Sequence, residues 1–222
     1  MKVHVLVADP ALAAHAQRIE ASTITAIERV SQLLPLNGVD IVIQHNPIAT
    51  IPELGIGGFS PSGHLVHVAV DPAHADFSDV LDQHLSRTVA HELHHCARWR
   101  GPGYGRTLGE ALVSEGLADH FDLQVHAGAD PYHWTQALHP AALQETLEEA
   151  RETLWSTEYD HAYWFFNTAT GGPPYHAGYA LGFHLVRAYL LANPGSNPSD
   201  LAATPAKEIL DHVDASEPLG PS

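Results

Sequence analysis

His91, Glu92 and His95 form an HExxH pattern, a combination of residue types that can hold a metal ion and perform acid–base chemistry. Positions four apart on a helix lie about 40° apart around its axis, so His91 and His95 present their imidazoles to one point. Glu92 is rotated by about 100° from His91, which places it beside a water on the ion rather than on the ion itself. The spacing predicts a zinc site with Glu92 as general base.

A third ligand is expected from the ExxxD pattern of Glu115 and Asp119, on what reads as a separate helix. Two histidines and the Glu115 carboxylate leave the fourth zinc position open, which distinguishes a catalytic zinc site from a structural one. Asp119 shares a helix face with Glu115. It either accepts a hydrogen bond from the far nitrogen of a ligand histidine or is an ordinary solvated residue.

HExxH alone is weak evidence in a chain with 18 histidines among 222 residues. The downstream Glu and Asp strengthen it, and so does the helical context. Ser78 can cap a helix that continues through the motif to the stop at Gly101. Thr107 with Glu110 forms a capping box for a second helix that ends near Gly128. Both motifs are therefore expected inside helices.

Three neighbouring residues are not expected to bind the metal. His94 lies about 60° from the metal-facing side, and His120 about 100° from Asp119, so both are interpreted as packing or surface residues. Cys96 is the single cysteine, which excludes an internal disulfide and any multi-cysteine metal site. We expect it to be a small buried core residue.

Composition indicates a globular protein, with 45% hydrophobic and 16% charged residues. The N-terminal apolar run, residues 3–7, is too short for a signal peptide or a membrane span, which favours a cytoplasmic protein. The formal charge of −16 argues against binding nucleic acid or anionic membranes. Nothing in the sequence indicates the oligomeric state.

The N-terminal part reads as a β-α-β unit, with strands at residues 3–7 and 39–44 and a helix at 10–34. After a loop rich in Pro and Gly at residues 46–63, residues 64–70 read as a strand just before the HExxH helix. We expect this to be an edge strand. An extended peptide could pair along such an edge through main-chain hydrogen bonds.

The C-terminal half reads as helical, with helices at residues 140–154, 176–193 and 205–213. Its most unusual segment is 171–182, in which glycines and prolines precede Tyr175, His176 and Tyr179 at a helix start. Tyr179 or, as second choice, His176 is predicted to donate a hydrogen bond to the oxyanion of a hydrolytic reaction. The alternative is that this segment only packs against the metal helices.

Three segments carry a resemblance to a known family: HELHH at 91–95, EALVSEGLADHF at 110–121 and AGYALGFHLV at 177–186. Here the chain resembles the gluzincins, zinc metallopeptidases with an HExxH helix and a glutamate ligand on the next helix. It is most similar to a small bacterial family of predicted zinc-dependent proteases. The resemblance implies zinc bound by His91, His95 and Glu115, Glu92 as general base and acid, and a small mixed sheet flanked by helices.

The expected fold is therefore α+β: a small mixed sheet, then a mostly helical C-terminal half. We expect one zincin-like catalytic domain over residues 1–222, with a sheet lobe at 1–75 and a helical lobe at 76–215. The leading function is a zinc metallopeptidase that acts on a peptide or protein substrate. The alternatives are a non-catalytic, zinc-stabilised protein that binds a peptide or partner, and a metal-dependent hydrolase of another amide.

Overall fold

The computed structural model describes residues 1–167 and 171–212. The chain divides into two compact units, Met1–Arg100 and Gly101–Ser222, and each is described by itself. The HExxH motif belongs to the first unit and Glu115 to the second. The grouping of both units into one catalytic domain stays a prediction.

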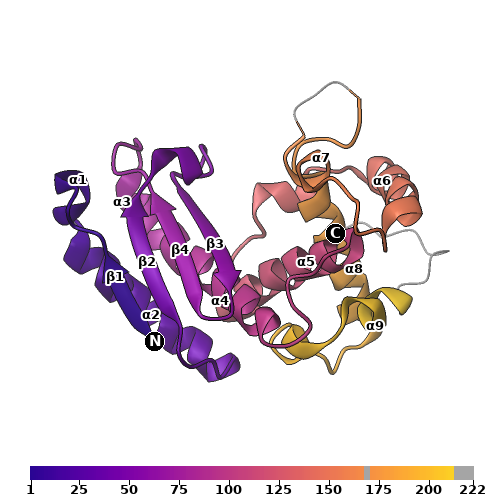
Figure 1. Ribbon diagram of the computed structural model, residues 1–222, viewed down its shortest axis with the longest axis horizontal. Helices are drawn as coiled ribbons and strands as arrows, with labels where there is room; N and C mark the ends of the chain where they lie inside the picture. The colour runs from indigo at the N-terminus through magenta and orange to yellow at the C-terminus, as the bar shows by residue number, and fades with distance from the viewer. Residues whose placement is uncertain (168–170, 213–222) are drawn as a thin grey trace. The chain divides into compact units, whose positions relative to one another are not determined.

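A four-stranded mixed sheet forms the framework of the first unit (Figure 1). Its strands, in spatial order, are β1 (Lys2–Val5), β2 (Asp40–His45), β4 (Leu65–Val70) and β3 (Ile56–Ser62). β1, β2 and β4 run parallel, whereas β3 is antiparallel to β4. Among the described residues, the mixed sheet precedes a mostly helical remainder, which confirms the predicted α+β class.

Two long helices cover one face of this sheet. α2 (Ala16–Leu33) packs against β1, α4 (Leu85–Trp99) packs against β3 and β4, and the two helices contact each other. Alternate strand residues such as Ile41, Ile43 and Val68 are fully buried beneath them. The helix predicted at residues 10–34 is interrupted after α1 (Pro10–Ala13), where the ring of His15 packs against Phe77.

The prediction that the strand before the HExxH helix is an edge strand was wrong. β4 is an inner strand because it pairs with β2 on one side and with β3 on the other. The edge strand is β3, whose residues were read as a loop because of Gly57, Gly58 and Pro61. Tertiary contacts explain these residues, since a Cβ on Gly57 would lie 2.3 Å from the carbonyl oxygen of Ala49. Pro61 is tolerated at an edge, where its missing N–H breaks no ladder.

The helix that carries HExxH begins irregularly. α3 (Phe77–Asp79) leads through a π-helical turn, η2 (Val80–His84), into α4. The apolar side of α4 faces the core, with Leu85, Val89 and Leu93 fully buried. Burial of this stripe sets the rotation of α4, and with it the direction of the opposite side, which carries His91 and His95.

The second unit is built on two helices that pack against each other, α5 (Leu108–Val125) and α8 (Ala177–Ala192). A Cβ on Gly116 would lie 2.2 Å from the carbonyl oxygen of Gly182, and one on Gly182 would lie 2.2 Å from that of Leu112. The two backbones therefore touch. Other α-helices that the structure describes in this unit are α6 (Pro140–Thr153), α7 (His161–Phe165) and α9 (Ala206–Asp211).

Most predicted helices of this unit are confirmed. The Thr107 capping box is present, and α5 ends at a cap on His126, close to the expected end. α6 and α8 match the predictions for 140–154 and 176–193. α9 falls within the prediction for 205–213, but Val213 lies outside the described residues. Within the described ranges, no helix combines the length and apolarity needed to cross a bilayer.

Candidate metal centre

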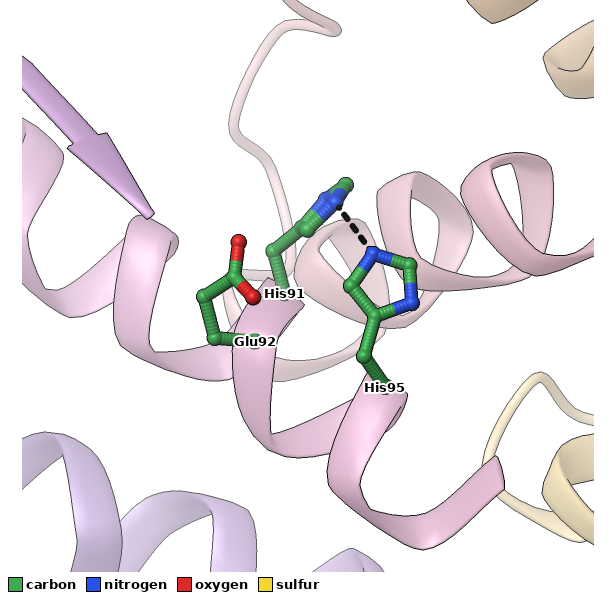
Figure 2. Close-up of side chains that lie close together, drawn as sticks. All are labelled: His91, Glu92 and His95. Atoms are coloured by element: carbon green, nitrogen blue, oxygen red, sulfur yellow. Dashed lines mark hydrogen bonds between the residues drawn. The ribbon is translucent and has the colours of Figure 1, made fainter. Parts of the chain in front are cut away.

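His91 and His95 face each other across one turn of α4 (Figure 2). Their Nε2 atoms lie 3.0 Å apart and their ring planes are inclined at 80°. In each ring, the Nε2 atom points away from the helix and toward the other ring. The local prediction for this pair, two imidazoles directed at one point, is what the helix produces.

Glu92 completes the cluster. A carboxylate oxygen of Glu92 and the two imidazole nitrogens all lie within 4.8 Å of one another. Glu92 is only 5% exposed, and its Oε2 accepts a hydrogen bond of 2.8 Å from the hydroxyl of Ser60 on β3. The carboxylate is thus buried and oriented.

The two Nε2 atoms of His91 and His95 are placed as donors to one zinc ion would be. Two lone pairs that face each other at 3.0 Å repel unless a proton or a cation lies between them. Nitrogens bound to one tetrahedral zinc at about 2.0–2.1 Å each are separated by about 3.3 Å, close to the separation found here. Imidazole nitrogen is a preferred zinc ligand, and two imidazoles with one carboxylate form a known catalytic donor set.

Glu115, the predicted third ligand, lies in the middle of α5 in the second unit. It is 6% exposed, and its Oε1 accepts a hydrogen bond of 2.7 Å from the hydroxyl of Tyr104. Burial, and then the charge of Glu115, raise the pKa of Tyr104 well above its usual value, so this phenol stays a donor. A buried carboxylate with an oriented oxygen is suited to metal binding.

Asp119 lies one helical turn beyond Glu115, and its Oδ2 accepts a hydrogen bond of 3.0 Å from the indole of Trp134. It is 4% exposed, so the alternative of an ordinary solvated residue was wrong. Its predicted bond to a ligand histidine stays a prediction. The contact between Trp134 and Asp119 could not be predicted from the sequence, because nothing in the spacing of these two residues connects them.

Tyr179 and His176 lie at the start of α8 in an aromatic cluster. His176 precedes the helix in the left-handed conformation (φ 66°) and is 7% exposed, and its ring contacts that of Tyr179 at 5.7 Å. Tyr179 also packs edge-on against Phe165 at 5.0 Å. The neighbouring Tyr175 is 43% exposed. The segment therefore packs within the aromatic cluster of the second unit. The role of Tyr179 or His176 as oxyanion donor stays a prediction.

Two further groups near Glu115 have no sequence signal. The hydroxyl of Tyr159 and Nδ1 of His161 form a hydrogen bond of 3.1 Å. Burial lowers the pKa of His161, and the charge of Glu115 acts in the opposite direction. Burial and then the charge of Glu115 raise the pKa of Tyr159. These residues precede and begin α7, a short helix that periodicity could not detect.

The residues rejected as ligands are packing residues. His94 is fully buried. His120 stacks on Phe183 at 4.1 Å and hydrogen-bonds to its carbonyl oxygen, and burial lowers its pKa to about 4. Cys96 is also fully buried, which confirms the predicted core position, and burial raises the pKa of its thiol to about 11.

Comparison with protein families agrees with the local geometry. The sequence profile of a family described as "Predicted Zn-dependent protease (DUF2268)" matches residues 19–211, which include the HExxH helix, α5 and α8. Neither a curated protein nor a solved structure matches the chain.

Proposed function

Because the chain belongs to the DUF2268 family of predicted Zn-dependent proteases, we propose that it is a zinc metallopeptidase with Glu92 as its general base. The observation that carries the proposal is the cluster of His91, Glu92 and His95 on α4, in which two imidazole nitrogens face each other beside a buried carboxylate. The family description names zinc, and the cluster, which lies within the matched residues, provides nitrogen and carboxylate groups that suit this ion.

His91, His95 and Glu115 would hold the ion. Zinc bound there would supply Lewis-acid chemistry: it would lower the pKa of a water to about 7 and polarise a substrate carbonyl. Tyr104 supports the assignment of Glu115 as third ligand, because the Tyr104 hydroxyl donates a hydrogen bond to Oε1 and holds the carboxylate in one orientation. Asp119 is proposed to orient a ligand histidine from the turn beyond Glu115.

Glu92 would take a proton from the attacking water and return it to the leaving amine. Two features of its surroundings support this role. The side chain is buried, so its proton transfers are shielded from bulk water, and the Ser60 hydroxyl contacts one oxygen only, Oε2. A purely structural zinc site would not need an oriented carboxylate next to its ligands, which argues against the non-catalytic alternative.

A peptide substrate would lie extended along β3. Within the first unit, β3 is an edge strand of the sheet, which favours the addition of a strand along it. The carbonyl oxygens of Ile56 and Ser60 already accept hydrogen bonds from Ile51 and Trp99, so an added strand would pair with other main-chain groups of β3. β3 also passes next to the general base, because a Cβ on Gly58 would lie 2.5 Å from the Glu92 side chain. Tyr179 or, as second choice, His176 is proposed as the donor to the oxyanion.

The test separates metal binding from chemistry. Purified protein should contain one zinc per chain and cleave members of a quenched-fluorescent peptide library. Glu92→Gln should keep the zinc and lose about 10²–10⁴-fold in turnover, because an amide fits the site but cannot accept a proton. The exposed Glu53→Gln is the matched control and should behave as the parent. Turnover of Glu92→Gln within a few-fold of the parent would remove Glu92 from the mechanism.

A further inference from the structure

β3 contains a bulge beside Glu92. Phe59 pairs with His67 and Ser62 pairs with Leu65, so β3 advances by three residues while β4 advances by two. A bulge bends its strand and changes the direction of the side chains within it. Ser60 lies in this irregular stretch. The bulge therefore decides where the Ser60 hydroxyl points.

Ser60 is tied to α4 through both its side chain and its backbone. Its hydroxyl lies 2.8 Å from Oε2 and 2.9 Å from the main-chain oxygen of Glu92, and it is 5% exposed. A hydroxyl has one proton, and the charged acceptor makes the stronger hydrogen bond. The Ser60 carbonyl in turn accepts a hydrogen bond of 2.8 Å from the indole of Trp99.

Gly58 bounds the same carboxylate at its other oxygen. A Cβ on Gly58 would lie 2.5 Å from both Cγ and Oε1 of Glu92, a separation that real Cβ atoms do not show. The strand can pass this close only because residue 58 has no side chain. β3 thus meets Glu92 at Oε1 through Gly58 and at Oε2 through Ser60.

We propose that Ser60 is a positioning residue, which holds the Glu92 carboxylate in the orientation that proton transfer requires. The inference rests on the proposed function of Glu92 as general base. A free glutamate side chain samples many rotamers, and a base contributes its full effect only when one of its oxygens is already directed at the proton. The Ser60 hydroxyl donates a hydrogen bond to Oε2, so Oε1 is the oxygen that would accept the proton.

The first test is kinetic. Ser60→Ala should keep its zinc and lose about 10- to 100-fold in kcat, the usual effect of removing a partner of a reacting group. KM should stay within about threefold, because Ser60 acts through Glu92 and not on the substrate. Ser60→Thr keeps the hydroxyl and should restore most of kcat. Ser62→Ala removes a hydroxyl two residues further along β3 and should leave kcat unchanged.

A second readout needs neither zinc nor substrate. In metal-free protein, Tm is measured for the parent, Ser60→Ala, Glu92→Ala and the double variant. The Tm loss caused by Ser60→Ala should be at least about 2 °C larger in the parent than in the Glu92→Ala background, because only the parent keeps a buried carboxylate that loses its donor. If the parent cleaves no peptide, the proposed function fails, while this cycle still decides whether Ser60 holds Glu92.

Gly58→Ala provides a second variant should Ser60→Ala fail to fold. Its methyl group displaces the Glu92 side chain from the Oε1 side, so kcat should fall with zinc content retained. Equal Tm losses in the two backgrounds, or a folded Ser60→Ala enzyme with unchanged kcat, would overturn the proposal. An equal fall in kcat for Ser60→Thr and Ser60→Ala would also overturn it, because the hydroxyl would then not be the group that matters.

Discussion

The crossing of α5 and α8 offers a test in which two known effects oppose each other. Gly116 lies in α5, next to Glu115, and an added Cβ would lie 2.2 Å from the carbonyl oxygen of Gly182 and 2.9 Å from the Val186 side chain. Alanine is a better helix former than glycine by about 1 kcal/mol, so Gly116→Ala would stabilise an isolated helix. In the folded protein the same substitution forces two backbones apart.

The size of the second effect follows from the geometry. Carbon and oxygen need more than 3.0 Å, so the helices must separate by nearly 1 Å, and a main-chain carbonyl cannot rotate away as a side chain can. Overpacking of this kind costs about 1–3 kcal/mol, and the rigid contact places Gly116→Ala near the upper end. After the helix gain is subtracted, we expect a loss of about 2 kcal/mol, or about 4–8 °C in Tm for a chain of this size.

Thermal unfolding followed by circular dichroism measures this loss. Gly195→Ala is the matched control, because no atom lies within 4 Å of its added Cβ and its φ is not positive. That variant should be neutral or more stable by up to about 1 kcal/mol, through the smaller entropy of its unfolded chain. A Gly116→Ala protein as stable as the parent would show that the helices do not touch at this point.

Three further predictions concern the metal, the oxyanion and pH. His95→Ala should remove most of the zinc while the folded His94→Ala variant retains it, and equal losses by elemental analysis would contradict the ligand assignment. Tyr179→Phe should lose on the order of a hundredfold in turnover at unchanged zinc content, and unchanged turnover would leave Tyr179 as core packing. His120, with a folded pKa of about 4 against 6.5 when unfolded, binds its proton more readily in the unfolded chain. Stability should therefore fall as the pH drops from 6.5 toward 4, by roughly 3 kcal/mol from this group, and the fall should be smaller in His120→Gln.

The facing pair of imidazoles on α4 could be predicted from sequence because its geometry is local. The convergence of His91 and His95 needs only the periodicity of a helix, and the helix is specified by the apolar stripe on its other side. The capping box of Thr107 and Glu110 likewise lies within four consecutive residues. These two features depend on neighbouring positions in one helix and were predicted correctly. The prediction that Ser78 caps the HExxH helix was wrong, because Ser78 lies inside α3 and not at its N-terminal cap.

The order of the strands and the partners of Glu92 were decided by tertiary structure. β3 reads as a loop because Gly58 and Pro61 disfavour strands locally, and it becomes an edge strand through pairing with β4 and packing on α4. Ser60 meets Glu92 from 32 residues away through a bulge, and Tyr104 meets Glu115 across a turn. Such contacts form when separate elements pack together, and no periodicity within either element carries information about the partner.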